Sequence, residues 1–335
     1  MEGRAVNEKD PRNAPGRSDR QGMSIIEFFQ LFPNDRAAEQ WFEGRRWPNG
    51  LCCPDCGSCN TVETKNRKPQ PYRCRDCRRH FNVRTGTVMQ GSRVGYQKWL
   101  LAMYLMVTGI RGTAAMKVHR ELKVSYKTAW YLMQRIREGF FGGVDPLEGT
   151  VEVDEVFIGG KQENRHVKDQ ERYSATDAYG KKVVVAAVER GGKVVGEVIE
   201  NTDANTLTRF VEGNVQHASR VITDDHGGYT DLMENYRHRS VKHSAGEYVK
   251  DVDVHTNTVE SLWSTLKRGY VGTYYKMSPK HLHRYVNEFT GRKNQRDMDT
   301  TEQLAELFDG FIGRRLKYDD LIAYNGRPSG ARSGW

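Results

Sequence analysis

The sequence predicts a multidomain α+β protein that combines a small cysteine-rich module, a helical segment and a mixed α/β domain. All six cysteines fall between residues 52 and 77. Residues 96–141 read as helix throughout. From about residue 149, Val-rich runs alternate with turns and are followed by helices, an order that favours a mixed sheet.

Changes in composition divide the 335 residues into segments, and the length alone favours two or three domains. The expected segments are a disordered tail over 1–22, short helices over 23–50, a zinc ribbon over 51–88, a helical segment over 89–145, a mixed α/β domain over 146–300 and a C-terminal tail over 301–335. Met23 is an alternative functional start, because the residues before it are polar and contain Pro and Gly.

The charge of the chain points to an acidic partner. Lys and Arg exceed Asp and Glu by nine, and the pI is about 9.2. Such an excess favours nucleic acid, although an ordinary basic protein also fits the charge alone. No run approaches the ~20 apolar residues that span a bilayer, and the N-terminus lacks the apolar core of a secretory signal. We therefore expect a soluble, cytoplasmic protein.

Two Cys-x-x-Cys pairs predict a metal site. Each such turn aims two thiolates at one point, and two turns supply the tetrahedral sulfur cage that Zn²⁺ prefers. Four protein ligands leave no open position, so we expect one structural Zn²⁺ that contributes to folding; a redox pair is the alternative. The expected ligands are Cys53, Cys56, Cys74 and Cys77. Cys52 and Cys59 are expected to remain thiols outside the ligand set.

The helical segment predicts a second DNA-binding module. Three helices are expected within 96–141, with Thr113 and Ser125 as N-caps, and Asp35 is expected to cap an earlier helix. The last two helices have helix-turn-helix-like proportions, and a plain helical bundle is the alternative. Basic residues near the second cysteine pair and on the third helix are candidates for phosphate contact. The candidate DNA-binding residues are Arg75, Arg78, Arg79, Lys127, Thr128, Arg135, Arg137 and Arg268.

The mixed α/β domain is predicted from alternation and turn signals. Strands are expected at 150–159, 181–190, 193–200, 219–225 and 240–244, and Gly191–Gly192 favours a hairpin between the second and third. Helices are expected at 204–215, 257–269 and 279–293. Residues 159–180 have no apolar period and are expected to form a polar loop.

Three acidic residues in this domain are candidates for a catalytic metal site. Asp154 lies in an apolar strand, where an unpaired charge is costly, and Asp224 ends a strand expected beside it. Glu260 shares a helical face with Lys267, which suits a phosphodiester substrate, and Trp263 is expected nearby. Carboxylates favour Mg²⁺, with Mn²⁺ as a substitute. Glu155 is expected on the opposite strand face, whereas Asp225 could replace Asp224.

Taken together, these motifs resemble a bacterial insertion-sequence transposase family that has an N-terminal zinc ribbon and is related to the Merlin elements. The resemblance covers about residues 23–300 and rests on long segments in order. They are "RCRDCRRHFNVRTGTVM", "VEVDEVFIGGK", "ITDDHGGY" and "HTNTVESLWSTLKRGYVGTYYKMSPKHLHRYVNEF".

The resemblance implies a ribonuclease-H-like mixed α/β catalytic core with a DDE triad of Asp154, Asp224 and Glu260, followed by Lys267. It also implies binding of double-stranded DNA at the element ends and in the target, action as a homo-oligomer, and Mg²⁺-dependent cleavage followed by strand transfer. Two alternatives stay open: a catalytically silent or domesticated DNA-binding protein, and a nuclease that hydrolyses without joining.

Overall fold

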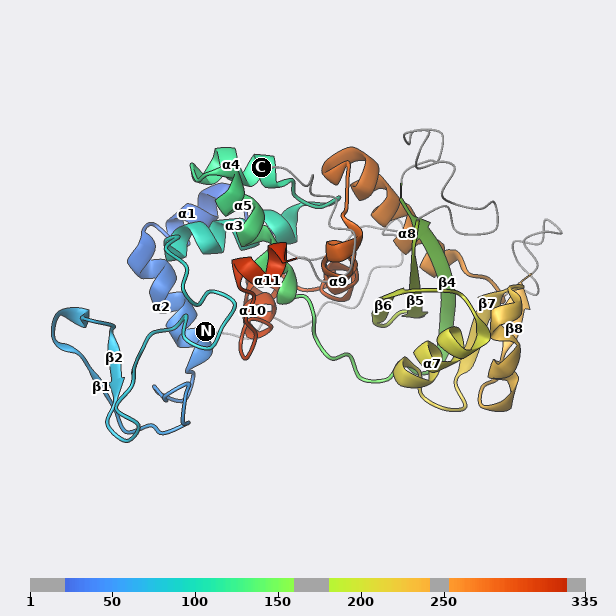
Figure 1. Cartoon of the computed structure of the whole chain (residues 1–335), viewed down its shortest axis with the longest axis horizontal. Coiled ribbons are helices and arrows are strands. Elements are labelled where there is room, and N and C mark those ends of the chain that lie inside the picture. The colour runs from blue at the N-terminus through green and yellow to red at the C-terminus, as the bar shows by residue number, and fades with distance from the viewer. Residues whose placement is uncertain (1–21, 160–180, 242–252, 324–335) are drawn as a thin grey trace, which may run out of the picture.

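The computed structural model describes residues 22–159, 181–241 and 253–323 (Figure 1). The predicted disordered tail, except for its last residue, and the predicted polar loop after residue 159 lie outside these ranges. No helix in the described part of the chain has the length and apolar character needed to cross a bilayer.

The N-terminal half folds as a helical module around one hydrophobic core. Its helices are α1 (Ile25–Leu31), α2 (Asp35–Arg46), α3 (Tyr96–Thr108), α4 (Ala115–Leu122) and α5 (Tyr126–Glu138). The core also receives Leu304, Leu307, Phe308 and Phe311 from α10 (Thr300–Asp309) and the residues just after it. The segment predicted as a C-terminal tail from residue 301 thus begins with apolar side chains that pack in the core of the N-terminal module, and within the described residues the short α11 (Tyr318–Ile322) follows.

The helix caps confirm one prediction and correct two. Ser125 caps α5, since its Oγ accepts a hydrogen bond from the Thr128 backbone N–H at 3.1 Å. Asn34, not Asp35, caps α2; the Asp35 carboxylate instead accepts from the backbone N–H of Gln97, 3.0 Å away, at the start of α3. Thr113 lies before the N-cap of α4, and its buried hydroxyl donates to the Leu105 carbonyl at 2.7 Å.

The cysteine-rich module is a small antiparallel sheet that follows α2. Its strands are β1 (Thr61–Glu63), β2 (Tyr72–Cys74) and β3 (His80–Phe81), and the 3-10 turn η1 (Lys65–Arg67) lies between the first two. Trp47, Tyr72 and Phe81 form an aromatic cluster with ring centroids about 6 Å apart. This cluster gives a short sheet an apolar base.

The second half of the chain is a five-stranded mixed sheet. Its strands are β4 (Thr150–Ile158), β5 (Lys182–Glu189), β6 (Val194–Ile199), β7 (Arg220–Asp224) and β8 (Arg239–Val241), in the order β6-β5-β4-β7-β8. β4, β5 and β6 are antiparallel neighbours, whereas β7 is parallel to both β4 and β8. The hairpin predicted at Gly191–Gly192 is confirmed, with Gly191 at a φ of 77°.

Helices cover both faces of the sheet (Figure 1). Residues 151 and 153 of β4 pack toward α7 (Ala204–Asn214) and the 3-10 segment η3 (Gly227–Glu234). Residues 156 and 158 of the same strand pack toward α8 (Asn257–Gly269) and α9 (Leu282–Asn294). A π-helical turn, η5 (Tyr270–Tyr274), and the 3-10 turn η6 (Pro279–His281) connect α8 to α9. Because successive side chains of a strand point to opposite faces, each face of β4 packs against its own layer of helices.

A buried ion pair connects the helical module to the sheet domain. Arg137 of α5 lies 2.7 Å from Glu288 of α9, and both side chains are at most 2% exposed. The guanidinium also lies 4.1 Å from the Tyr285 ring centroid, and the Tyr274 hydroxyl donates to Glu288 at 2.6 Å. Because α9 packs against β6 as well, this pair fixes α5 relative to the sheet.

We predict that Glu288→Leu alone destabilises the protein by about 3–5 kcal/mol, because it leaves the Arg137 charge buried without its partner. Adding Arg137→Met should recover most of that loss. Urea unfolding followed by circular dichroism measures both effects, with the exposed pair of Arg296 and Asp297 as control, where loss of the charge should change stability by less than about 0.5 kcal/mol. A single Glu288 variant as stable as the control would contradict this account of the pair.

Candidate carboxylate site and zinc centre

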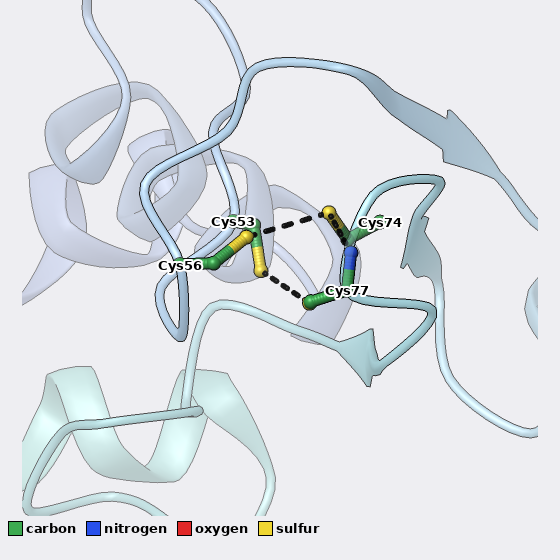
Figure 2. Close-up of side chains that lie close together, drawn as sticks. All are labelled: Cys53, Cys56, Cys74 and Cys77. Carbon is green, nitrogen blue, oxygen red and sulfur yellow. Dashed lines mark hydrogen bonds between the residues drawn. The ribbon is translucent and has the colours of Figure 1, made fainter.

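Four cysteines converge at the base of the small sheet. Figure 2 shows Cys53 and Cys56 on one turn facing Cys74 and Cys77 on the other. The sulfur atoms of Cys53 and Cys77 lie 3.6 Å apart, as do those of Cys56 and Cys74, and all four lie within 4.8 Å of one another. Tetrahedral Zn–S bonds of about 2.3 Å place sulfur atoms roughly 3.8 Å apart. The cluster therefore fits the structural Zn²⁺ predicted from the spacing.

The four thiols of the cluster do not shift together: the pKa of Cys74 is lowered, whereas burial and the neighbouring thiols raise the pKa of Cys56 and that of Cys77. The pKa of Cys74 is lowered to about 7, chiefly by the backbone N–H of Cys77, whose nitrogen lies 3.5 Å from the sulfur. Cys52 and Cys59 form a disulfide across the first turn. The prediction that these two remain thiols is therefore wrong: the turn that brings Cys53 to Cys56 also places their flanking cysteines together.

Asp154 and Asp224 lie on adjacent parallel strands. The pairing of β4 with β7 aligns Glu152 with Ile222, and two residues further along both strands the same register reaches Asp154 and Asp224. Parallel neighbours at one register position point to the same face of a sheet. Two residues 70 positions apart in the sequence are thus brought side by side by strand pairing alone.

The carboxyl group of Asp154 occupies a setting that opposes its ionisation. Burial raises its pKa to about 7, and the charges of Glu155 and Asp224 add to the effect. The Trp263 indole N–H donates to its Oδ2 at 3.0 Å and partly offsets that increase. Trp263 therefore stands beside the acid, as predicted. A group held this far from its usual pKa in a cluster of acids is a candidate functional residue.

The neighbouring acids fall where strand alternation puts them. Glu155 lies on the other face of β4, where its Oε2 accepts from the Tyr229 hydroxyl at 2.5 Å, so the preference for Asp154 on the α8 side agrees with the structure. Asp224 contributes to the raised pKa values of Asp154 and Glu155. Asp225 is exposed, which favours Asp224 as the acid of the cluster.

Glu260 lies in the first turn of α8, on the helix that carries Trp263. Its side chain is exposed, and its Oε1 accepts from the Thr256 hydroxyl at 3.0 Å. Lys267, two turns later, is exposed as well. Within the described residues, Asp154, Asp224 and Glu260 do not form a group as tight as the four cysteines.

Glu152 is the residue of this region that sequence reasoning missed. It is fully buried, yet its carboxylate accepts from the Thr258 backbone N–H at 2.7 Å, the Thr258 hydroxyl at 2.9 Å and the Val259 backbone N–H at 3.1 Å. Arg190 donates to the same group at 2.7 Å. A helix N-terminus favours a carboxylate in this position, so Glu152 fixes the start of α8 against β4. An acid two residues before Asp154 in a Val-rich strand was the available signal.

Two of the predicted DNA contacts are inside the protein. Arg137 is buried in its ion pair, and Arg135 is 6% exposed and donates to the backbone carbonyls of Leu316 and Gln90 at 3.2 and 2.7 Å. Burial of this kind is incompatible with reaching a DNA groove, so both residues have structural roles. The second half of α5 is therefore not a surface for DNA, although α4 and α5 are joined by the three residues 123–125 as expected.

The other predicted DNA contacts lie at the surface or partly so. Lys127 is exposed, with its Nζ 4.4 Å from the Tyr318 ring centroid, and Thr128 is half-buried. Arg268 is exposed and donates to the Ser264 hydroxyl at 2.7 Å. Near the zinc centre, Arg75, Arg78 and Arg79 are exposed, and Arg79 pairs with Asp55 at 3.2 Å.

Comparison with known proteins places these sites in one family. Residues 33–80 match a transposase zinc-ribbon domain, and residues 146–294 match an ISXO2-like transposase domain. An uncharacterised protein in transposable element ISH50 of Halobacterium salinarum is 32% identical over 276 residues, which cover 79% of this chain and 92% of the relative. Both domains occur in order along one chain, with the cysteine cluster in the first and the acids in the second. The chain belongs to the IS1595 family of transposases.

Proposed function

We propose that this transposase cleaves and joins DNA with a carboxylate triad of Asp154, Asp224 and Glu260, assisted by Lys267. The observation that carries the proposal is the register that puts Asp154 beside Asp224, where burial and mutual charge raise the pKa of Asp154. Such a cluster is costly unless a cation or a proton neutralises it. A divalent cation bound by these carboxylates would neutralise them and could act on a phosphate substrate.

The sheet supports a ribonuclease-H-like assignment for this domain. Three antiparallel strands are followed by two parallel ones, and the first strand is central in the order β6-β5-β4-β7-β8. In that arrangement the first acid lies on the central strand, the second at the end of its parallel neighbour and the third on a helix that covers the same face. Asp154, Asp224 and Glu260 occupy these places.

The oxygen donors of the triad suit Mg²⁺, with Mn²⁺ as a substitute. Bound there, divalent ions would supply activation of the attacking oxygen and charge stabilisation of the departing one. The protein's own groups prepare the site: Trp263 orients the Asp154 carboxylate through its N–H, and Glu152 holds the start of α8 against β4. Lys267 is placed to meet a phosphate two turns beyond Glu260.

We infer that the substrate is double-stranded DNA at the element ends and in the target, bound by a homo-oligomer. The residues proposed to contact it are Arg75, Arg78, Arg79, Lys127, Thr128 and Arg268, all exposed except Thr128, which is half-buried. The zinc centre would fix the first three, since they lie on or beside the turn that carries Cys74 and Cys77. A catalytically silent DNA-binding protein and a nuclease without joining activity are the competing proposals.

Asp154→Asn and Asp224→Asn should each lower Mg²⁺-dependent cleavage of labelled element ends by roughly 10³-fold or more, as removal of an essential catalytic group does. Asp225→Asn is the matched control and should retain activity, because its side chain is exposed beside the cluster. Equal cleavage by wild type and Asp154→Asn would refute the triad. Pre-cut ends test joining separately: wild type should form a strand-transfer product, and hydrolysis alone would support the nuclease.

Asp154→Asn should also stabilise the metal-free protein in a pH-dependent manner. The raised pKa means that folding opposes ionisation, so the wild type loses stability as pH rises from about 4, the usual pKa, to about 7, and the loss is constant above that. Thermal unfolding in buffer without Mg²⁺ and without a chelator, so that the structural zinc stays bound, should show almost no gain from the substitution at pH 4 and the largest gain at pH 8, at most about 4 kcal/mol. Mg²⁺ should stabilise wild type at pH 8 and leave the variant nearly unchanged. A larger gain at pH 4 than at pH 8 would contradict the charge argument.

Zinc removal should unfold the small sheet and weaken DNA binding. A chelator or Cys74→Ser removes a ligand whose binding energy contributes directly to folding. We expect loss of one bound zinc per chain, faster proteolysis within residues 51–88 and weaker binding of element ends. The control is Cys52→Ser, which breaks the disulfide to Cys59 but leaves the four sulfur ligands in place and should keep the zinc. Metal content, limited proteolysis and gel shift measure these effects. Undiminished end binding after complete zinc loss would remove the proposed role of the ribbon.

A further inference from the structure

We propose that the turn after α8 is a stacking platform for an unstacked base of the element DNA, with Tyr275 as the stacking residue. The inference rests on the proposed function of the carboxylate site and extends it to a second contact with the same DNA. Tyr275 is 78% exposed, whereas a tyrosine side chain in a folded protein is usually at least partly buried.

The backbone holds Tyr275 in a conformation that costs free energy. Its φ is 57°, a region that residues other than Gly rarely adopt, and the Lys276 backbone N–H donates to the Tyr274 carbonyl at 2.6 Å across it. This is a γ-turn of the strained kind. It directly follows a π-helical turn, a feature that is frequent at functional sites. Strain of this kind persists only where the surrounding structure enforces it.

The base of the turn supplies that enforcement. The Tyr274 hydroxyl donates to the buried carboxylate of Glu288 at 2.6 Å and accepts from the Thr113 backbone N–H at 3.1 Å. A Cβ on Gly112 would lie 2.2 Å from the same hydroxyl, so the loop between α3 and α4 closes on Tyr274. Tyr274 is therefore fixed while Tyr275, the next residue, is presented to solvent.

Exposed apolar and basic residues gather around the platform. A Cβ on Gly269 would lie 2.9 Å from the Arg111 carbonyl oxygen, which places the α3–α4 loop against the end of α8. Ile110 on that loop is 83% exposed, and Val271 on the turn is 67% exposed. The exposed cations on these two segments and on the end of α8 are Arg111, Lys267, Arg268 and Lys276.

The combination of an exposed aromatic ring with surrounding cations suits a nucleic-acid strand. Bases stack on aromatic side chains and phosphates meet Lys and Arg, largely regardless of sequence. The cations disfavour another copy of this basic chain as the occupant, since like charges would face each other. Glu260 and Gly269 are nine residues apart on one helix, or about 13 Å along its axis. Tyr275 lies beyond the end of this helix, so a strand that stacks on Tyr275 and also reaches the carboxylate site spans several nucleotides.

A 2-aminopurine scan of the element end tests the platform on the full-length protein. The fluorescent base is placed in turn at each position within six nucleotides on either side of the cleaved bond. We expect wild type to stack one base on Tyr275 and therefore to quench the 2-aminopurine fluorescence at one position of the scan. Tyr275→Ala should abolish that signal and weaken binding of DNA with a gap there about tenfold, whereas Tyr275→Trp should retain both.

Two further variants separate stacking from folding. Tyr275→Gly accepts the positive φ without strain, so it should be at least as thermally stable as wild type and yet lose the signal. Met233→Ala removes an equally exposed apolar side chain from η3 and should change nothing. Wild-type cleavage of the unlabelled end shows separately whether the carboxylate triad acts as proposed. An unchanged fluorescence profile in Tyr275→Ala, or a changed oligomeric state without DNA, would overturn the platform.

Discussion

The geometry of the sheet domain depends on one buried carboxylate. Glu152 accepts hydrogen bonds from two backbone N–H groups at the start of α8. Burying a carboxylate without partners is costly, but this one, at 0% exposure, receives the Thr258 and Val259 N–H groups and the Arg190 guanidinium. The helix start gains the acceptor that its free N–H groups require, and the strand gains a fixed neighbour. Because Glu152 and Asp154 share a strand face, fixing α8 at the first also sets its distance from the second. Trp263 reaches Asp154 as a consequence.

A second buried acid, Glu288, fixes the other end of the same helix. It binds Arg137 of the helical module and, through the Tyr274 hydroxyl, the turn that follows α8. The helix that carries Glu260 and Lys267 is thus held at its start by the sheet and at its end by α9 and α5. A rigid helix between two anchors is a suitable frame for residues that must meet one substrate at several points. The basic residues in the second half of α5 are not available to DNA for the same kind of reason. Arg137 is bound to Glu288, and Arg135 donates to backbone carbonyls inside the protein.

Features set by short-range rules were predictable from the sequence, and those set by contacts across the fold were not. The Cys-x-x-Cys pairs, the Gly191–Gly192 hairpin and the amphipathic α8 each depend on residues close together in the chain, and each is found as expected. The position of Glu152 in a Val-rich strand was visible, but its role was not, because the helix N–H groups that it binds lie more than 100 residues away. The return of α10 to the N-terminal core has the same origin: its apolar face is visible in the sequence, but the surface that covers it is not. The error in the α2 cap is of one residue. Asn34 and Asp35 are both suitable N-cap residues, and Asp35 instead accepts a hydrogen bond from the start of α3.

The raised pKa of Asp154 connects the physical state of the site to its proposed use. Folding brings Asp154, Glu155 and Asp224 into one region where each charge opposes the others and burial opposes Asp154 most. That arrangement lowers the stability of the fold in the absence of a cation. Apolar residues at the same positions, like the neighbouring valines, would give a more stable fold. Hydrogen bonds offset only part of this cost: Trp263 donates to Asp154 and Tyr229 donates to Glu155, and the pKa of each acid is still raised. The divalent cation proposed above would supply the missing positive charge, and carboxylates that folding brings together without it would bind such an ion strongly.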